Sequence, residues 1–217
     1  MATKKNVEEK IFVPKPDLKA VTLHIVGDTP LICHAWSQKA KQMMLSKQMK
    51  KATAGREARR PAVEFADSLY WLTEKPQLED LTDEEAQGVL NKVIPVSKFG
   101  FPVLAFKSAA VDAGYQQKIL DKKTTARGAF HIAGEFAEIE GTPTFREDMT
   151  RIDGGRTAQI AFRAEFKTWA TTLFIKVNTR ALSIEEVVNL FNFGGFANGV
   201  GDWRPAKGGN YGTFHVE

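Results

Sequence analysis

The glycine-rich end of the chain carries the residues whose types and spacing could do chemistry. Seven of the 17 glycines fall within the last 24 residues, and residues 194–212 interleave them with Trp203, Arg204, Lys207 and Tyr211. Glycine lets a phosphate approach the backbone closely, the cations can pair with phosphate, and the rings offer stacking surfaces for bases. The pattern predicts a loop that cradles a nucleic-acid backbone. A helix C-cap and hairpin, with Trp203 packed on the core, would explain the same residues.

A run of cations in residues 38–60 is the second feature with a chemical interpretation. This run has a net charge of +7, so the rest of the chain sums to −3 within the total of +4. Clustered cations neutralise phosphates, which predicts sequence-tolerant nucleic-acid binding that weakens steeply with salt. A solvated surface is the alternative. The cations of the run are Lys39, Lys41, Lys47, Lys50, Lys51, Arg56, Arg59 and Arg60.

Other residues that could form a catalytic, metal or cofactor site are not arranged as one. None of the four histidines stands in a metal-like arrangement with another histidine, a cysteine or a carboxylate, so we expect no zinc site. No Gly-x-Ser-x-Gly elbow occurs, and Cys33 with a distant histidine does not define a thiol enzyme. The phosphate-loop spacing Gly-x-x-x-x-Gly-Lys-Ser/Thr is absent as well. The sequence therefore predicts no metal, no cofactor and no enzyme activity.

Composition limits the class of protein. The chain has 217 residues, 43% of them hydrophobic, and a single cysteine. It can bury a real core, it cannot be a disulfide scaffold, and no apolar run reaches the ~20 residues of a membrane helix. We expect a soluble, intracellular protein.

The elements that must position these residues begin with a strand over 21–26 and a helix over 34–52. In that helix Trp36, Ala40, Met43 and Met44 form an apolar stripe, but the same stripe continues into lysines. Because lysines are rarely buried without a partner, we expect the helix to leave the core near Leu45. Residues 53–61 would then form an exposed basic loop.

Further along the chain, helices and strands alternate in a recognisable order. Helices are expected at 62–72, 82–91 and 106–113, the last with a small buried face that approaches a sheet, and again from Ser183. The helices that begin at Thr82 and Ser183 each start with a capping box. Strand patterns follow residue 129, with Phe130, Ile132 and Phe136 on one face, and a short strand ends the chain. In one of these strands Leu173, Ile175 and Val177 alternate with residues 174, 176 and 178. Without the helical insertion the order approximates β-α-β-β-α-β. The sequence therefore predicts an α+β fold, a ferredoxin-like antiparallel sheet with helices on one face, a helical insertion and a C-terminal Gly-rich loop.

We expect the chain to consist of an arm and one domain. Residues 1–19 form the arm, and residues 20–217 form a single ferredoxin-like domain. The domain carries a basic extension at 38–60 and an insertion at about 61–98.

Three segments of the sequence share features with one known family. They are Gly27-Asp28-Thr29-Pro30-Leu31 after the first strand, residues 101–109 (FPVLAFKSA) leading into a helix, and the Gly-rich segment before the last strand. Together they resemble the RAMP superfamily, the RNA-binding backbone proteins of CRISPR effector complexes, so the sheet is expected to be RAMP/RRM-like. The tail from Gly199 to Pro205 also resembles those of uncharacterised bacteriophage proteins, which implies the cytoplasm of a bacterium or of a phage-infected cell. The resemblance implies a ferredoxin-like core that binds single strands through their backbone and often stacks into filaments. By position it implies contacts from Lys107, Arg204 and Lys207.

The leading hypothesis is a non-enzymatic, sequence-tolerant protein that binds single-stranded DNA or RNA and forms homo-oligomers along it, for annealing in recombination or for coating a guide RNA. The predicted binding residues are the eight cations of 38–60 with Lys107, Trp203, Arg204 and Lys207. One alternative is a metal-independent RAMP-type endoribonuclease with His34 or His24 as acid and base. The other is a phage structural or assembly protein.

Overall fold

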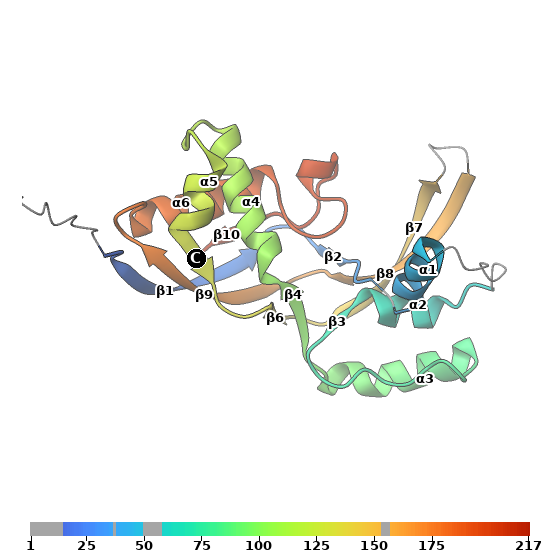
Figure 1. The fold of residues 1–217 in the computed structure, drawn as a ribbon. Helices are drawn as coiled ribbons and strands as arrows, with labels where there is room; N and C mark the ends of the chain where they lie inside the picture. The colour runs from blue at the N-terminus through green and yellow to red at the C-terminus, as the bar shows by residue number, and fades with distance from the viewer. Residues whose placement is uncertain (1–14, 37, 50–57, 153–156) are drawn as a thin grey trace, which may run out of the picture.

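The computed structural model describes residues 15–36, 38–49, 58–152 and 157–217. This part of the chain contains six α-helices and two antiparallel sheets (Figure 1). The predicted α+β class with an antiparallel sheet is confirmed. None of the described helices is long and apolar enough to cross a membrane.

The larger sheet holds the core of the molecule. Helices α4 (Val103–Gln116) and α6 (Ile184–Ala197) pack on one of its faces (Figure 1). Its central strand is β9, which spans Ala170–Asn178. There Leu173, Ile175 and Val177 are buried while Phe174 and Lys176 are exposed, as the alternating pattern predicted. Its strands run in the order β10 (Phe214–Val216), β1 (Leu18–Gly27), β9 (Ala170–Asn178), β6 (Phe136–Glu140), β4 (Phe99–Pro102) and β3 (Tyr70–Trp71), and β5 (Phe130–Ile132) also pairs with β9.

The smaller sheet continues the larger one around a corner. It consists of β2 (Leu31–Cys33), β8 (Thr157–Phe166) and β7 (Pro143–Ile152), and the β7–β8 hairpin projects from the body (Figure 1). Trp169 fills the corner, where its Nε1 donates to the carbonyl oxygen of Thr29 at 2.8 Å. Gly27 lies directly against the indole, in a place where a Cβ would not fit.

Helix α1 (Gln38–Gln48) lies outside the core along its described length. Met43, Met44 and Leu45 are each about half exposed, and so is Met49 just beyond the helix. The expectation that this helix leaves the core near Leu45 is therefore wrong. Helix α2 (Pro61–Ser68) packs on β8 of the small sheet, whereas α1 packs extensively on no other described helix or strand. Lys50, Lys51 and Arg56 lie outside the described residues.

Several boundaries differ from the predicted ones. The helix expected over 62–72 ends at Ser68, and Tyr70–Trp71 instead pairs with β4 as an edge strand. Phe130 and Phe136 belong to separate strands, the first buried and the second exposed, so they do not share a face. β1 begins at Leu18, which brings the end of the predicted arm into the sheet. Three short helical segments were not predicted: α5 (Lys123–Ala129) and the 3₁₀ turns Ile94–Val96 and Pro205–Lys207.

The capping boxes are where the sequence placed them. Helix α3 (Asp83–Val93) begins after Thr82, whose side chain accepts from the backbone of Glu85 while the Glu85 carboxylate accepts from the backbone of Thr82. Ser183 and Glu186 make the same pair at the start of α6. Each pair satisfies two backbone donors that a helix start leaves open.

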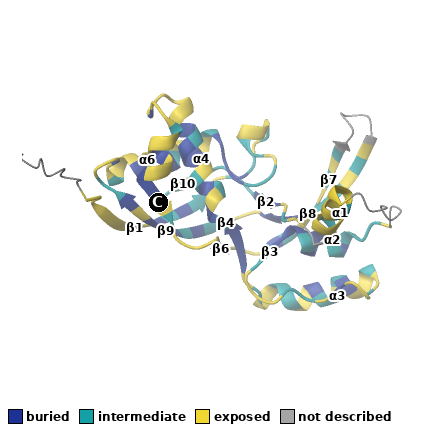
Figure 2. Cartoon of the chain, viewed as in Figure 1, coloured by how far each residue is buried: buried dark blue, intermediate teal, exposed yellow. Residues whose placement is uncertain are grey.

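The small face of α4 meets α6 rather than the sheet. A Cβ on Gly194 would come within 2.6 Å of the Ala110 nitrogen, so the two helices touch backbone to backbone. Asn198, buried at the end of α6, donates from Nδ2 to the carbonyl oxygen of Ala109 at 2.9 Å. The larger Phe106 is the residue of α4 that packs on strand β10, against Phe214. Figure 2 shows the buried inner sides of both helices.

Candidate functional site

A cleft of about 670 Å³ opens between α4 and the segment that follows α6. Residues 198–207 form one wall, and residues of α4 between Leu104 and Gln116 form the other. The chain just after β2 closes one end with His34 and Trp36. Trp36 and Leu104 are strongly exposed at 59% and 69%, so the cleft offers solvent an aromatic and an aliphatic surface.

The glycines of this segment allow its close path against β2. Gly199 and Gly201 have φ of 63° and 81°, a conformation that favours glycine. A Cβ on Gly201 would lie 2.6 Å from the Ile32 carbonyl oxygen, and the next residue, Asp202, donates its backbone N–H to that same oxygen at 3.0 Å. The chain then enters a 3₁₀ turn, Pro205–Lys207, which presents its basic residues to the cleft.

The free charge of the cleft is positive. The Lys207 ammonium makes no ion pair or hydrogen bond with any other described residue, and Arg204 uses one nitrogen to donate to the Gly201 carbonyl oxygen at 2.8 Å. The two carboxylates of the lining are already paired: Asp112 with Lys123 at 2.8 Å, and Asp202 as described below. An anionic ligand would therefore meet two available cations and no unpaired carboxylate of the described lining.

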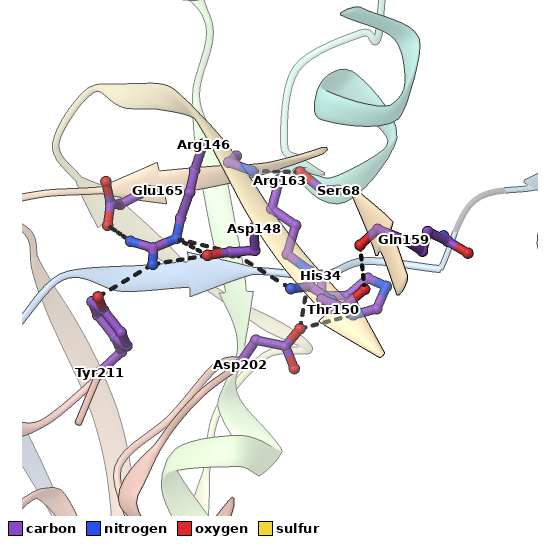
Figure 3. A network of polar contacts seen from close by, with 11 residues as sticks. His34, Ser68, Arg146, Asp148, Thr150, Gln159, Arg163, Glu165, Asp202 and Tyr211 are labelled. Atoms are coloured by element: carbon purple, nitrogen blue, oxygen red, sulfur yellow. Dashed lines mark hydrogen bonds and ion pairs between the residues drawn. The ribbon is translucent and has the colours of Figure 1, made fainter. Parts of the chain in front are cut away.

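Behind the cleft, a network of charged side chains joins the β7–β8 hairpin to the glycine-rich segment (Figure 3). Arg146 donates from Nε to Asp148 at 2.9 Å, from one terminal nitrogen to Glu165 at 2.5 Å, and from the other to the Tyr211 hydroxyl at 3.2 Å. Its guanidinium also stacks over the Tyr211 ring, 4.6 Å from the centroid. The hydrogen bond to Asp148 is the main cause that raises the pKa of Arg146.

Arg163 extends this network toward the cleft. It lies 3.6 Å from Asp148 and, through Nε, 3.2 Å from Asp202. These are ion-pair distances, but Nε and one terminal nitrogen are buried without a hydrogen bond in the described part of the chain. Burying guanidinium groups is costly unless carboxylates compensate them, so the two aspartates hold these arginines in place.

His34 and Asp202 form the end of the network at the cleft. Nδ1 of His34 lies 2.9 Å from Oδ2 of Asp202 (Figure 3). The hydrogen bond from His34, followed by the charge of Arg163, lowers the pKa of Asp202 below the ordinary value for an aspartate, against the opposing effect of burial. In the tautomer that donates from Nδ1 to an ionised Asp202, the Nε2 of a neutral His34 ring keeps its lone pair.

A second cleft of about 480 Å³ shares His34 and Trp36 with the first. It runs between residues 34–36 with Ala40 and the hairpin, where Thr150 and Gln159 lie on the same side as Arg163. Thr150 donates to the Gln159 carbonyl oxygen at 3.1 Å. Trp36 therefore lies at the border of the two clefts.

The structure brings together only part of the predicted site. Arg204 and Lys207 line the cleft, and Trp203 lies beside it, outside the lining, 41% exposed and with an unusual φ of 54°. Lys107 faces away from the cleft: it donates to the Arg127 carbonyl oxygen at 2.9 Å and lies over the Phe130 ring, and burial lowers its pKa. The expected grouping of Lys107 with Arg204 and Lys207 is not found.

The cations of the basic run divide into two kinds. Arg59 pairs with Glu64 and donates to the Ile160 carbonyl oxygen, and Arg60 donates to the carbonyl oxygens of Leu78, Glu79 and Leu81. Both arginines therefore hold α2 in place. Lys41 and Lys47 are exposed on α1, which also carries Lys39.

The sequence pattern did not indicate that Trp36 lines a cleft or that His34 pairs with Asp202. The apolar stripe predicts that Trp36 is buried in a helix, but it precedes α1 and is exposed. His34 and Asp202 are 168 positions apart, so no local spacing could connect them. The available signal was the single aspartate among the glycines and cations of residues 199–209.

Within the described ranges, no group of three or more His, Cys, Asp or Glu residues could hold a metal ion. No protein-family model matches the sequence, and no curated protein matches it significantly.

Proposed function

We propose that this protein binds single-stranded nucleic acid without sequence preference and holds the strand in the cleft between α4 and residues 198–207. The observation that carries the proposal is that two available cations, Arg204 and Lys207, line the same cleft as the exposed side chains of Trp36 and Leu104. Phosphates would lie against the cations and a base against the indole. Every base has a face that can stack, so such a site tolerates any sequence.

The topology supports a ferredoxin-like, RAMP-type interpretation of the fold. Strands β10, β1, β9 and β5 are neighbours in this order and pair antiparallel throughout. With α4 before β5 and α6 before β10, this is the order that a β-α-β-β-α-β unit produces. Residues 198–213 stand where the RAMP resemblance expects a glycine-rich loop. On this proposal the strand is DNA or RNA, and copies of the protein assemble along it.

The second cleft extends the proposed path. A strand that leaves the first cleft past Trp36 would meet the polar side of the hairpin, with Thr150, Gln159 and Arg163. Lys50, Lys51 and Arg56, which the sequence predicts as phosphate contacts, follow α1 in the chain outside the described residues, and their contacts stay a prediction.

Binding of labelled oligo-dT and oligo-U over a series of salt concentrations tests the proposal. The Arg204→Gln/Lys207→Gln variant should lose roughly tenfold or more in affinity at low salt, and the slope of log K against log salt should become shallower by about 1.4 for two lost phosphate contacts. Both oligonucleotides should be affected equally, because the lost contacts are to phosphate.

Lys92→Gln/Lys167→Gln is the matched control, since both lysines are exposed and line neither cleft. It should bind like the wild type apart from a small general effect of charge. A wild-type protein that does not bind at low salt, or that binds with a flat salt response, would contradict the proposal. Equal losses of affinity in the two variants would mean that the binding site lies elsewhere.

The His34–Asp202 pair favours a second candidate, cleavage of bound RNA. A histidine oriented by a carboxylate can take a proton through Nε2. His34 would accept the proton of a ribose 2′-hydroxyl, whose oxygen attacks phosphorus as the P–O5′ bond breaks, and water would protonate the leaving 5′-oxygen. The products would be a 2′,3′-cyclic phosphate and a 5′-hydroxyl.

End-labelled RNA incubated in EDTA tests this candidate, with the same sequence as DNA for comparison. Cleavage of RNA alone that falls about a hundredfold or more in His34→Ala, and less in Asp202→Asn, would support it. RNA that stays intact, or cleavage that His34→Ala retains, would exclude it and leave the binding proposal unaffected.

A further inference from the structure

Helix α1 exposes large apolar side chains that no other described helix or strand covers. Figure 2 shows most of it exposed, and it packs extensively on no other described helix or strand. Met43, Met44 and Leu45 point to different sides because they are consecutive, and Met49 adds a fourth exposed apolar side chain. The other residues of α1 are mostly polar, but large apolar side chains that are exposed as a group are typical of an interaction surface.

The charge on α1 is entirely positive. It carries Lys39, Lys41 and Lys47 and no acidic residue. Lysines alone would suit a phosphate backbone. The exposed apolar side chains between them gain stability only against another apolar surface, and a phosphate backbone does not provide one. The combination therefore fits a protein surface that is acidic and partly apolar.

The same chain presents such a surface around α3. Residues 74–85, which we call the acidic segment, hold six carboxylates and one lysine. Four of these carboxylates, Glu74, Glu79, Asp80 and Glu84, are exposed and form no ion pair with another described residue. At the other end of α3, Val96 is 80% exposed. Leu72, also exposed, donates its backbone N–H to the carbonyl oxygen of Lys98, two residues beyond Val96.

The two surfaces lie on different sides of the same region. In the view of Figure 1, α1 is on one side of α2 and α3 is on the other. We infer that α1 of one copy docks on the acidic segment and α3 of the next. The two surfaces are different, so the contact is head-to-tail. A head-to-tail contact that does not close into a ring produces an open filament. This deepens the oligomerisation in the proposed function, but it requires no nucleic acid.

A charge-exchange experiment tests the inference on nuclease-treated protein, with sedimentation velocity as the readout. Variant A carries Lys41→Glu/Lys47→Glu, and variant B carries Glu79→Lys/Asp80→Lys/Glu84→Lys. Each alone sets like charges against each other across the interface, so self-association should weaken about tenfold or more. An equimolar mixture of A and B restores opposite charges at every contact and should recover large assemblies.

The Lys122→Glu/Lys167→Glu variant matches the charge change of variant A away from both surfaces and should assemble like the wild type. Met43→Gln/Met44→Gln tests the apolar part and should weaken assembly without loss of helical circular dichroism. A wild-type protein that stays monomeric up to its solubility limit would overturn the inference, as would a mixture of A and B that stays dissociated.

A closed symmetric dimer would also overturn it, since the proposed contact is head-to-tail. If variant A assembles normally but binds oligonucleotides weakly, α1 contacts nucleic acid instead. The Arg204→Gln/Lys207→Gln variant should assemble like the wild type, so failure of this inference and failure of the proposed function are seen in separate measurements.

Discussion

Replacing Gly195 with alanine should destabilise the protein by about 3 kcal/mol or more, because a Cβ at this position has no space. Gly195 lies in α6 where the helix crosses β10, and an added Cβ would overlap the carbonyl oxygen and the ring of Phe214. The obstacle is backbone, so a side-chain rotation cannot remove it. Either α6 must lift from the sheet or β10 must separate from β1. Urea unfolding followed by circular dichroism measures the loss.

Gly88→Ala provides the matched control, since Gly88 is also a helical glycine but has nothing within 4 Å of its would-be Cβ. There alanine should stabilise α3 by about 0.5–1 kcal/mol, the ordinary helix-propensity gain over glycine. If Gly195→Ala unfolds at the same urea concentration as the wild type, the close crossing of α6 over β10 is incorrect.

Replacing Asp148 with alanine should cost about 3 kcal/mol, because it removes the carboxylate that two arginines share. Asp148 is 12% exposed, and its partners Arg146 and Arg163 are 20% and 12% exposed. Without it Arg163 keeps only Asp202, and two of its nitrogens already lack hydrogen bonds within the described structure. The remaining cost is that of a poorly compensated cation in a largely buried site. Thermal unfolding should show it as a lowered midpoint.

Asp112→Ala is the comparison for this variant. Asp112 pairs with Lys123 at 2.8 Å, but both side chains are about 40% exposed, and such surface pairs contribute about 0–1 kcal/mol. A loss in Asp148→Ala that is no larger than the loss in Asp112→Ala would mean that water reaches the network. In that case the hairpin would not depend on these charges to keep its place against residues 198–213.

Sequence patterns predicted the features that depend on neighbouring residues. The alternation in β9 placed Leu173 and Ile175 inside and Phe174 outside, because successive side chains of a strand face opposite ways. The capping boxes at Thr82 and Ser183 fixed two helix starts, since their hydrogen bonds span only three residues. The α+β class followed from the order of these elements.

Sequence patterns did not predict which helices and strands pack against each other. The apolar residues of α1 indicated burial, but periodicity does not show which element would pack on them, and it is α2 that packs on β8. In the same way, the small face of α4 indicated close approach without identifying Gly194 of α6 as what approaches.

The charge and glycine content that first suggested nucleic acid were therefore visible in the sequence, but their arrangement was not. In the folded structure Arg59 and Arg60 hold α2, and Lys107 faces away from the cleft. Arg204 and Lys207 line the same cleft as Trp36. The fold also joins His34 to Asp202 across 168 positions. Helix and strand periodicity arises from local backbone geometry, whereas these contacts form only when the folded core brings distant segments to the same place.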